Sequence, residues 1–331
     1  MSLRILKAGL FDAIQDTGRY GYQYLGINPG GAMDITGMKL SNALVGNDLN
    51  EAVLEMHFPA AEIVFEEQML IALGGADLGA EINGEALPIL HPIIIQKNAV
   101  LQFRKNETGA RAYLAVKGGY QSQTWLHSNS THTRARAGGL EGRALRKNDQ
   151  ILTKQIFSGS FQGNGKLFTV LHWNVNLAGF YLKDAVRFIP GAEYHALNKL
   201  SQQKLETAGF SILPQSDRMG YRLKGDALSI QSPKEMISTA VPRGTIQLLP
   251  NGQLIILMAD HQTTGGYPRI GHVISAGFAA LAQMRASEKI RFQKTELAEA
   301  ETLLLEQERN LRQLQNACNF RLQEYLAVYQ K

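Results

Sequence analysis

Hydrophobic and polar positions alternate over short runs along most of the chain. The stretch Leu3–Ile14 alternates loosely and predicts a strand. From Val53 to Val116, short apolar runs are separated by turn residues, and Asn83-Gly84 between two such runs predicts a hairpin. Short strands at this close spacing favour a barrel or a sandwich over a βαβ fold. The strands expected in this part are Ala61–Phe65, Met69–Leu73, Ile93–Ile95, Val100–Arg104 and Ala112–Val116.

The same pattern returns in the second half of the chain. The segment Ser158–Lys166 is rich in Ser, Gly and Asn, so it predicts a linker between two lobes. A helix is expected around Ala196–Ala208, ending at Gly209. The strands expected after the linker are Val186–Ile189, Phe210–Leu213, Thr245–Leu248 and Leu254–Met258. Both halves therefore combine short strands with one short helix.

Two further segments have helical patterns. Asp34 is placed to cap a helix that runs to about Leu44 and stops at Gly46. The last segment, 294–331, has leucines at helical spacing and neither Pro nor Gly, so it predicts a long amphipathic helix. That helix can pack on its own chain, on a dimer mate or on a partner. The expected organisation is mainly β, with lobes at 1–157 and 166–293 and the helix at 294–331.

Composition narrows the class of protein. The chain has 331 residues, of which 44% are hydrophobic and 19% charged, which is typical of a globular protein. The net charge of +5 suits either a nucleic acid or anionic small molecules. Because no nucleic-acid recognition motif accompanies the charge, we expect no nucleic-acid partner. The single cysteine, Cys318, cannot form an internal disulfide. With no signal peptide and no membrane-length apolar run, a cytoplasmic location is expected.

Three stretches carry candidate chemistry, and the first is Asn28–Asp34. Its glycines, Gly30 and Gly31, allow the backbone to approach a ligand closely. Peptide N–H groups before the helix capped by Asp34 can hold a carboxylate or a phosphate. The alternative is an ordinary tight turn that leads into a helix cap.

The second stretch is Gly244–Ile270. An apolar strand, Leu254–Met258, leads into a polar loop with a Gly-Gly turn, and loops that leave rigid strands often carry binding sites. The polar groups suit hydrogen bonding to a small polar molecule, while His261 by itself is weak evidence. The candidates here are Gln247, Asp260, Gln262, Thr263, Thr264 and Tyr267.

The third candidate combines Asn129–Asp149 with Ser216–Leu223. Arg143 and Arg218 can bind a carboxylate or phosphate through two parallel hydrogen bonds. Alternatively, each arginine pairs with a nearby acid. The chain has no Cys-x-x-Cys pair and no His-Glu-x-x-His, so a metal site is not expected. It also has no Gly-x-x-x-x-Gly-Lys phosphate-binding loop, and the absence of Gly-x-Ser-x-Gly argues against a standard α/β-hydrolase.

Six blocks of sequence in a fixed order indicate a family. Over roughly residues 3–293 the chain resembles the biotin-dependent carboxyltransferase / allophanate hydrolase subunit 2 family, whose fold would be two cyclophilin-like β-barrel lobes. The blocks are PGGAMD (29–34), GGADLGAEING (74–84), YLAVKGGY (113–120), STHTRARAGGLEGRAL (130–145), SDRMGYRL (216–223) and QTTGGYPRIGHVISA (262–276).

The resemblance also implies a function. A chain of this size would be a subunit of an ATP-dependent 5-oxoprolinase complex, acting with a B-type (KipI-like) subunit and an A-type (LamB/YcsF-like) subunit. The alternatives in the family are a KipA-like regulator that binds a KipI-like kinase inhibitor, and a carboxyltransferase component like that of urea carboxylase. ATP would be used in the complex, and no biotin is expected on this chain because it has no Met-Lys-Met attachment sequence. Self-association stays open.

The residue types fit the implied chemistry. A lactam carbonyl is a poor electrophile, so its oxygen would have to be phosphorylated, and donors aimed at the developing negative charge would lower the barrier. We therefore expect catalytic roles for Asp260, Gln262 and Arg218. The residues expected to bind substrate are Gly30, Gly31, Asp34, Arg143, Gln247, Thr263, Thr264 and Tyr267.

Overall fold

The computed structural model describes residues 1–155, 157, 165–182, 184–231 and 236–329. Most of the predicted linker, residues 158–164, lies outside the described residues. The chain forms two compact units. The first unit contains Met1–Gly18, Asp34–Leu177 and Glu308–Lys331, and the second contains Arg19–Met33 and Ala178–Gln307.

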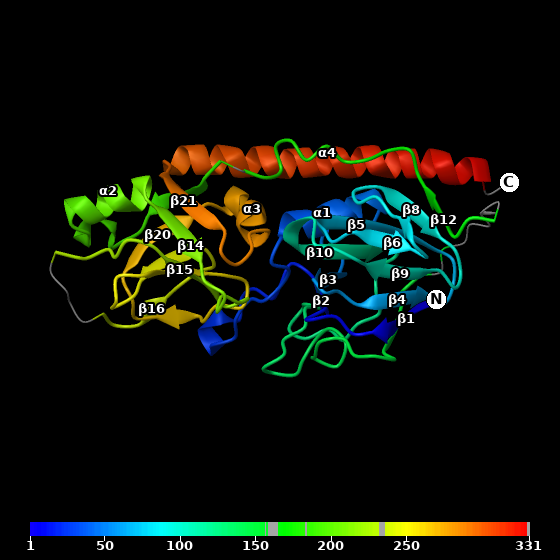
Figure 1. Cartoon of the computed structure of the whole chain (residues 1–331), viewed down its shortest axis with the longest axis horizontal. Helices are drawn as coiled ribbons and strands as arrows, with labels where there is room; N and C mark the ends of the chain where they lie inside the picture. Colours follow the sequence, from blue (N-terminus) through cyan, green and yellow to red (C-terminus); the bar gives the residue numbers. More distant parts are fainter. Residues whose placement is uncertain (156, 158–164, 183, 232–235, 330–331) are drawn as a thin grey trace. The chain divides into compact units, whose positions relative to one another are not determined.

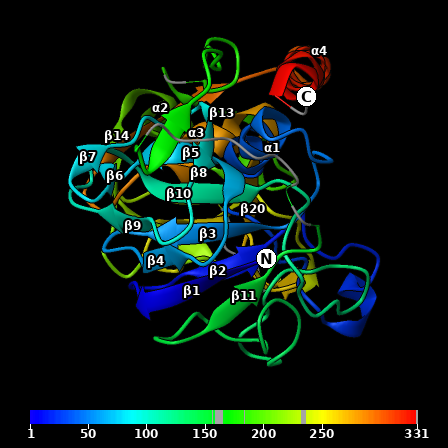
Figure 2. The ribbon, with the colours of Figure 1, turned by 90° about the vertical axis from the view of Figure 1, so that its right-hand side faces the viewer.

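The first unit is built from two six-stranded sheets. One sheet has the order β11-β1-β4-β9-β6-β7 and the other has the order β12-β8-β5-β10-β3-β2 (Figure 2). Inward-facing side chains of both sheets, among them Leu3, Phe65, Ile71 and Leu114, form one apolar core. The strands are β1 (Ser2–Lys7), β2 (Ala13–Gln15), β3 (Val53–His57), β4 (Glu62–Phe65), β5 (Met69–Asp77), β6 (Ala80–Ile82), β7 (Glu85–Ala86), β8 (Pro92–Ile95), β9 (Val100–Phe103), β10 (Thr108–Val116), β11 (Gln150–Leu152) and β12 (Phe168–Val170).

The single strand predicted over Leu3–Ile14 is wrong, because β1 and β2 belong to different sheets. The turn between the two strands is fixed by Asp12. Its Oδ1 accepts from the backbone N–H of His57 at 3.1 Å and its Oδ2 accepts from that of Ala61 at 2.7 Å. A buried carboxylate held by backbone donors can impose a corner that hydrophobic alternation does not reveal.

Two local predictions in this unit are confirmed. Asn83-Gly84 joins β6 and β7 in a two-residue hairpin, with Ile82 opposite Glu85. Helix α1 (Ile35–Leu44) begins after Asp34, whose Oδ1 accepts from the N–H of Gly37 at 2.8 Å. The helix is followed by Gly46, which has a φ of 67°. A left-handed residue just beyond a helix end is the conformation that glycine adopts most easily.

The second unit is a closed seven-stranded barrel with the order β13-β20-β17-β18-β15-β14-β21. Its first and last strands pair in parallel and close the barrel, with Val186 opposite Phe292. Phe188, Phe210 and Ile256 lie in its core. Its elements are η1 (Gln23–Leu25), β13 (Val186–Pro190), η2 (Tyr194–Ala196), α2 (Lys199–Thr207), β14 (Gly209–Ile212), β15 (Gly220–Lys224), β16 (Thr239–Ala240), β17 (Thr245–Leu248), β18 (Leu254–Leu257), β19 (Thr264–Gly265), β20 (Arg269–Val273), η3 (Ser275–Gly277), α3 (Phe278–Ala282) and β21 (Lys289–Lys294).

The predicted terminal helix is confirmed as α4 (Leu297–Tyr329), drawn from orange to red in Figure 1. From Glu308 onward it belongs to the first unit. There Leu311 and Leu322 are buried, and Glu308 forms an ion pair with Lys39 of α1 at 2.7 Å. Gln315 donates to the carbonyl of Asn47 at 3.1 Å. This part of the helix therefore packs on its own chain.

The mainly β fold with few helices and a long terminal helix is as predicted, but the units differ from the boundaries 1–157, 166–293 and 294–331. Arg19–Met33 joins the second unit, although residues on both sides of it belong to the first. The first unit extends to Leu177, because β12 completes a sheet by pairing with β8, with Phe168 opposite Ile95. The terminal helix is not a separate domain, since its residues are divided between the two units.

Candidate functional site

The candidate site in the second unit starts where strand β18 ends. The residues after it, Met258 and Ala259, are still buried, and Asp260 is the first partly exposed residue beyond them. The N–H of Met258 donates to the carbonyl of Met219 at 3.0 Å, and that of Asp260 donates to the carbonyl of Arg218 at 2.8 Å. These backbone bonds extend the pairing of β15 with β18, so that Asp260 and Arg218 leave neighbouring strands side by side.

Arg218 and Asp260 form a two-pronged ion pair. The Nε of Arg218 donates to Oδ2 of Asp260 at 2.8 Å, and its Nη2 donates to Oδ1 at 3.1 Å. The arginine side chain is 10% exposed and the aspartate side chain 29%. Parallel hydrogen bonds between a guanidinium and a carboxylate hold both groups in one plane. The sequence placed both residues in the catalytic set, and the structure brings them into direct contact.

The glycine-rich segment lies against this ion pair. The Nη2 of Arg218 also donates to the carbonyl of Gly31 at 2.6 Å. The N–H of Gly30 donates to the carbonyl of Ala259 at 3.2 Å, and the side-chain amide of Asn28 donates to that of Asp260 at 2.9 Å. The first and second candidate stretches of the sequence, more than 200 residues apart, therefore meet within one unit.

Gly30 could not be another residue without strain. Its φ is 65°, and a Cβ at this position would lie 2.9 Å from Nη1 of Arg19, a side chain that is only 1% exposed. Left-handed backbone and close approach of a neighbour are the two conditions that favour glycine. The tight turn predicted as an alternative for this stretch is thus present, and it is packed directly on charged groups.

Arg243 is a residue that the sequence reasoning did not select. Its Nη1 donates to the carbonyl of Ala32 at 3.2 Å and its Nη2 donates to that of Met33. Together with Arg218, it fixes three consecutive carbonyls of the glycine-rich segment. Its place just before Gly244, at the start of the second candidate stretch, was the only available signal.

His261 is buried beside the pair. Its Nδ1 lies 2.6 Å from the carbonyl oxygen of Gln262. Burial lowers the pKa of His261, the positive charge of Arg243 acts in the same direction, and the carbonyl of Gln262 acts against it. The imidazole is therefore neutral at pH 7. The sequence alone gave this histidine little weight, and the structure places it against the predicted catalytic residues.

Gln247 and Gln262 form the amide part of the site. The Nε2 of Gln262 lies 3.5 Å from Oε1 of Gln247, at the limit of a hydrogen bond. Gln247 is fully buried in β17, and its Nε2 has no hydrogen-bond partner among the described residues. A Cβ on Gly265 would lie 2.5 Å from this nitrogen. The glycine of the turn thus leaves room for a buried donor.

The remaining predicted residues of this loop are less tightly held. The carbonyl of Thr263 accepts from the N–H of Val241 at 3.1 Å, and Thr264 is exposed in the small β16–β19 ribbon. Tyr267 is 44% exposed. Roles for these three side chains stay predictions.

Asp34 and Arg143, also predicted to bind substrate, belong to the first unit. Asp34 is fully buried and its carboxylate caps α1, while its backbone N–H donates to the hydroxyl of Tyr113 at 2.7 Å. Arg143 donates to both oxygens of Asp149, at 2.7 and 2.9 Å, and to Glu141 at 3.0 Å. Both side chains already have structural partners, which was the alternative foreseen for the arginine.

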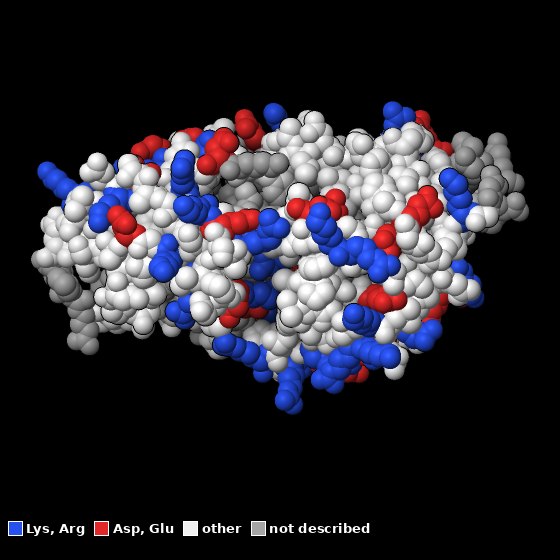
Figure 3. Space-filling view, viewed as in Figure 1, with Lys and Arg blue, Asp and Glu red and all other residues white. Residues whose placement is uncertain are grey.

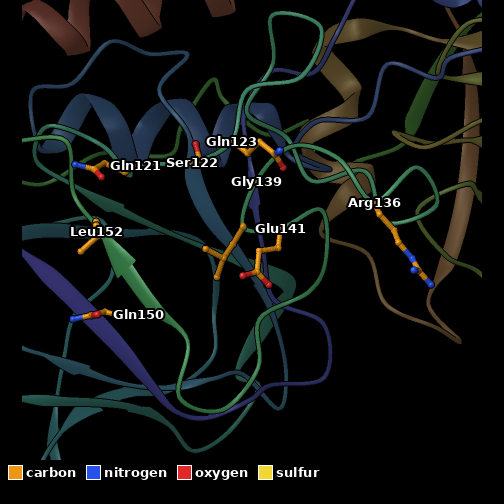
Figure 4. Close-up of a pocket in the computed structure, with 9 residues that line it drawn as sticks. Gln121, Ser122, Gln123, Arg136, Gly139, Glu141, Gln150 and Leu152 are labelled. Atoms are coloured by element: carbon orange, nitrogen blue, oxygen red, sulfur yellow. The ribbon is translucent and has the colours of Figure 1, made fainter.

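The first unit also carries an open groove of about 710 Å³ beside β11 (Figure 4). In the figure Arg136 extends away from the other lining residues. Several of its polar side chains are already bonded within the chain, since Gln150 donates to Glu66, Gln121 donates to the carbonyl of Thr153 and Glu141 accepts from Arg143. Its lining residues are Gln121, Ser122, Gln123, Arg136, Gly139, Leu140, Glu141, Gln150 and Leu152.

Exposed basic side chains gather on the loops formed by residues 134–147 of the first unit. They gather at the lower edge of the view in Figure 3, where Figure 1 draws the green loops of the first unit. The exposed cations of the loop are Arg134, Arg136, Arg146 and Lys147.

Among the described residues there is no group of three His, Cys, Asp or Glu side chains that could hold a metal ion. Nor is any helix in the described ranges long and apolar enough to cross a bilayer.

Comparison with known proteins places the chain in a family. The model of the carboxyltransferase domain, subdomain A and B, matches residues 25–294. The chain belongs to this carboxyltransferase family. The match covers both candidate stretches of the second unit and the Arg218–Asp260 pair, so the site described above lies in the part that defines the family.

Within the carboxyltransferase family, two relatives match over nearly their whole length. The C-type subunit of 5-oxoprolinase from Haemophilus influenzae is 35% identical over 88% of this chain and 90% of its own. The C-type subunit from Escherichia coli is 34% identical over 94% of this chain and 97% of its own.

A solved structure supports the same fold. The K. lactis urea amidolyase superimposes on 95% of this chain with a TM-score of 0.84 and 21% identity. This chain spans only 20% of that protein's length.

Proposed function

We propose that the chain is a subunit of an ATP-dependent 5-oxoprolinase complex that converts 5-oxo-L-proline to L-glutamate with A-type and B-type subunits. The observation that carries the proposal is the near full-length match, at 34–35% identity, to proteins named as the C-type subunit of 5-oxoprolinase in two bacteria. The match covers 90% and 97% of the lengths of those two relatives. Because the complex would use ATP and a small metabolite, a cytoplasmic location is part of the proposal.

The chemistry requires activation of an amide. Opening the ring adds one water across the C–N bond, and conversion of ATP to ADP and phosphate consumes a second. In this step the lactam oxygen would attack the γ-phosphorus of ATP, and the bond from that phosphorus to ADP would break. Negative charge would develop on the leaving oxygen of ADP, and the ring carbon would become electrophilic. A site for this step needs a fixed cation, a donor that reaches the amide oxygen, and a partner for the carboxylate of the substrate.

The second unit offers groups of these types. Arg218 is a cation whose orientation is fixed by Asp260 and by the carbonyl of Gly31. Gln247 provides a buried N–H donor with no partner in the described chain. Because burial makes the charged form of His261 unfavourable, its neutral imidazole offers one N–H donor and one nitrogen acceptor for hydrogen bonding. This combination suits a small anionic molecule that also contains an amide.

A second candidate function is a carboxyltransferase component acting on urea. It is favoured by the likeness to the urea amidolyase of Saccharomyces cerevisiae, which is 34% identical over 45% of this chain. The match covers 8% of that protein, so the comparison speaks for one domain only. A KipA-like regulator would bind a KipI-like protein without any turnover.

The test is reconstitution with the A-type and B-type subunits, followed by measurement of glutamate formed from 5-oxo-L-proline and ATP. Asp260→Asn and Gln262→Met should each lower the turnover of the complex at least about ten-fold, because each removes a group from the predicted site. Matched controls are Asp226→Asn and Gln215→Met, both exposed positions of the same unit, which should leave turnover unchanged.

The outcomes separate the candidate functions. Glutamate formation that depends on this chain supports the 5-oxoprolinase role. Carboxylation of urea from a carboxybiotin donor, without glutamate formation, would support the carboxyltransferase role instead. Stable binding of the B-type subunit with neither reaction would point to regulation. Unchanged turnover in both site variants would show that the chemistry lies elsewhere.

A further inference from the structure

Most of the net positive charge of the chain is concentrated in one loop of the first unit. Residues 133–149, called the basic loop below, contain five Lys or Arg and two Asp or Glu residues. They therefore carry +3 of the net charge of +5 of the whole chain. A local excess of one sign of charge attracts groups of the opposite sign and speeds their association.

The two acids of the basic loop are already neutralised within it. Asp149 accepts from Nη1 of Arg143 at 2.7 Å, and Glu141 accepts from Nε of the same arginine at 3.0 Å. No ion pair of the described residues includes Arg136 or Lys147, and both side chains are exposed. The internal ion pairs thus use Arg143 and leave the exposed cations to a separate molecule.

The basic loop is held in one shape by the rest of the first unit. The N–H of Leu145 donates to the carbonyl of Asp12 at 2.8 Å, and that of Asn148 donates to the carbonyl of Ile5 at 2.7 Å. A Cβ on Gly142 would lie 2.0 Å from the carbonyl carbon of Arg136, so two segments of the loop touch there. A surface that is ordered before binding loses less conformational entropy when a partner binds.

Two open grooves follow the basic loop, and Arg136 and Glu141 line both of them. One is the groove of about 710 Å³ beside β11, from which Arg136 extends outward in Figure 4. The other has a volume of about 530 Å³ and is also lined by Thr133 and Arg146. On β11 itself, Leu152 is 45% exposed and adds an apolar contact to the first groove.

The form of these grooves favours a protein segment over the other anions that a basic surface can bind. Small-molecule sites are usually concave and enclose most of the ligand, whereas both of these grooves are open. Grooves for single-stranded nucleic acids combine cations with aromatic side chains on which bases stack. No aromatic residue lines either groove, while Leu140 and Leu152 can pack against apolar side chains.

We infer that the basic loop and its two grooves form a docking surface for an acidic segment of a partner protein. The inference rests on the proposed function for the identity of that partner, which would be the A-type or the B-type subunit. It deepens that function, because it gives the first unit the task of assembling the complex. The surface lies wholly within the first unit and requires no contribution from the residues around Arg218 and Asp260.

The test is charge reversal at the exposed cations, with Arg136→Glu and Lys147→Glu combined in one chain. Association with the A-type subunit, the B-type subunit or both together is followed by biolayer interferometry. In low salt the association rate constant for at least one of them should fall about ten-fold or more, because charges at the rim of an interface mainly set the association rate. At about 0.5 M NaCl the difference from wild type should shrink, since salt screens exposed charges.

The matched control combines Lys289→Glu and Arg291→Glu, two exposed positions of β21 in the second unit that change the net charge equally. Its association rates should stay within about two-fold of wild type. The thermal unfolding midpoints of both variants should stay close to that of wild type, because substitution of exposed side chains usually changes stability little.

The outcomes separate this inference from the proposed function. Equal association rates in wild type and the basic-loop variant overturn the inference, as do equal losses in the basic-loop variant and the control. Failure of wild type to bind either subunit overturns it as well. Tight binding of duplex DNA that the basic-loop variant loses, with unchanged subunit association, would assign the loop to nucleic acid instead. A complex that assembles through the basic loop but forms no glutamate supports the inference and refutes the proposed function.

Discussion

Arg143 in the first unit and Arg218 in the second were both predicted to bind a carboxylate or phosphate. Both bind an aspartate of the chain through two parallel hydrogen bonds. Their partners differ in distance along the chain. Arg143 binds Glu141, Ala144 and Asp149, all within six residues. Arg218 binds Asp260, 42 residues away, and the carbonyl of Gly31, 187 residues away.

This difference separates two uses of the same ion pair. A guanidinium bound to its own loop stabilises the shape of that loop and has no further donor directed elsewhere. A guanidinium that binds distant segments creates a place where those segments meet, which is how sites with several contributing loops are assembled. Sequence separation of the partners, and not the presence of an ion pair, therefore identifies the arginine that belongs to a candidate site.

The largest expected effect is on the unfolding free energy and concerns Asp12. Its buried carboxyl group is held by backbone N–H donors and not by an arginine. Burial raises the pKa of Asp12 to about 7 from 3.8, against the backbone hydrogen bonds from His57, Ala61 and Gly9. The folded state thus binds this proton more tightly than the unfolded state. The associated stability is present below pH 4 and is lost as the pH rises to 7, by on the order of 4 kcal/mol.

Denaturant unfolding between pH 4 and pH 8 measures this effect. Asp12→Asn should show a smaller decline in unfolding free energy with rising pH than wild type, whatever its absolute stability. Parallel pH profiles for the two proteins would show that Asp12 ionises normally in the folded state.

Arg218→Met comes next, because it leaves Asp260 without its guanidinium and frees the carbonyl of Gly31. We expect a loss of about 3 kcal/mol in unfolding free energy, as for other partly buried pairs broken on one side. Activity of the complex should fall at least about a hundred-fold. Arg218→Lys keeps the positive charge but cannot form two parallel hydrogen bonds with Asp260. Relative to Arg218→Met, it should restore stability more than activity. Full activity in Arg218→Met would remove the distinction between the two arginines.

Gly30→Ala tests the contact between the glycine-rich segment and the residues around Arg218 and Asp260. The new Cβ would face Nη1 of Arg19 at 2.9 Å and would sit on a backbone with a φ of 65°. The matched control is Gly26→Ala, at a φ of 77° with no atom within 4 Å of the new Cβ. Each should lose about 1 kcal/mol from backbone strain, and Gly30→Ala about 1 kcal/mol more from crowding. Equal stability and activity of the two variants would show that the segment has room to move.

Arg143→Met should have the smallest effect. The side chain is 20% exposed and its partners lie on the same loop, so we expect a loss of about 1 kcal/mol. Activity of the complex should stay within two-fold of wild type. A large loss of activity at unchanged unfolding free energy would place this arginine in the functional site after all.

Much of the fold could be predicted because local rules decide it. Asp34 followed by a helix and Gly46 after it, Asn83-Gly84 between apolar runs, and the leucine spacing of the last segment all act over a few residues. The break between β1 and β2 could not be predicted, since it depends on Asp12 reaching the backbone of His57 and Ala61. The exchange of Arg19–Met33 into the second unit has the same origin in long-range contacts.

The candidate site shows the same limit. The ion pair of Arg218 and Asp260 came from two stretches that the sequence already singled out. Arg243 was missed because its function is to bind carbonyls of a segment 210 residues away, which no local pattern reports.

The assignment of Arg19–Met33 has a consequence for dissecting the gene. The polypeptide passes from one unit to the other four times, after Gly18, Met33, Leu177 and Gln307. A division of the coding sequence at any of these positions would therefore leave at least one unit without a segment that belongs to it. Expression of either half should give insoluble or protease-sensitive material, whereas co-expression of complementary halves could restore the whole. Exchange of halves between relatives is limited in the same way. The fifteen residues Arg19–Met33 would have to be exchanged together with Ala178–Gln307, because both segments belong to the second unit.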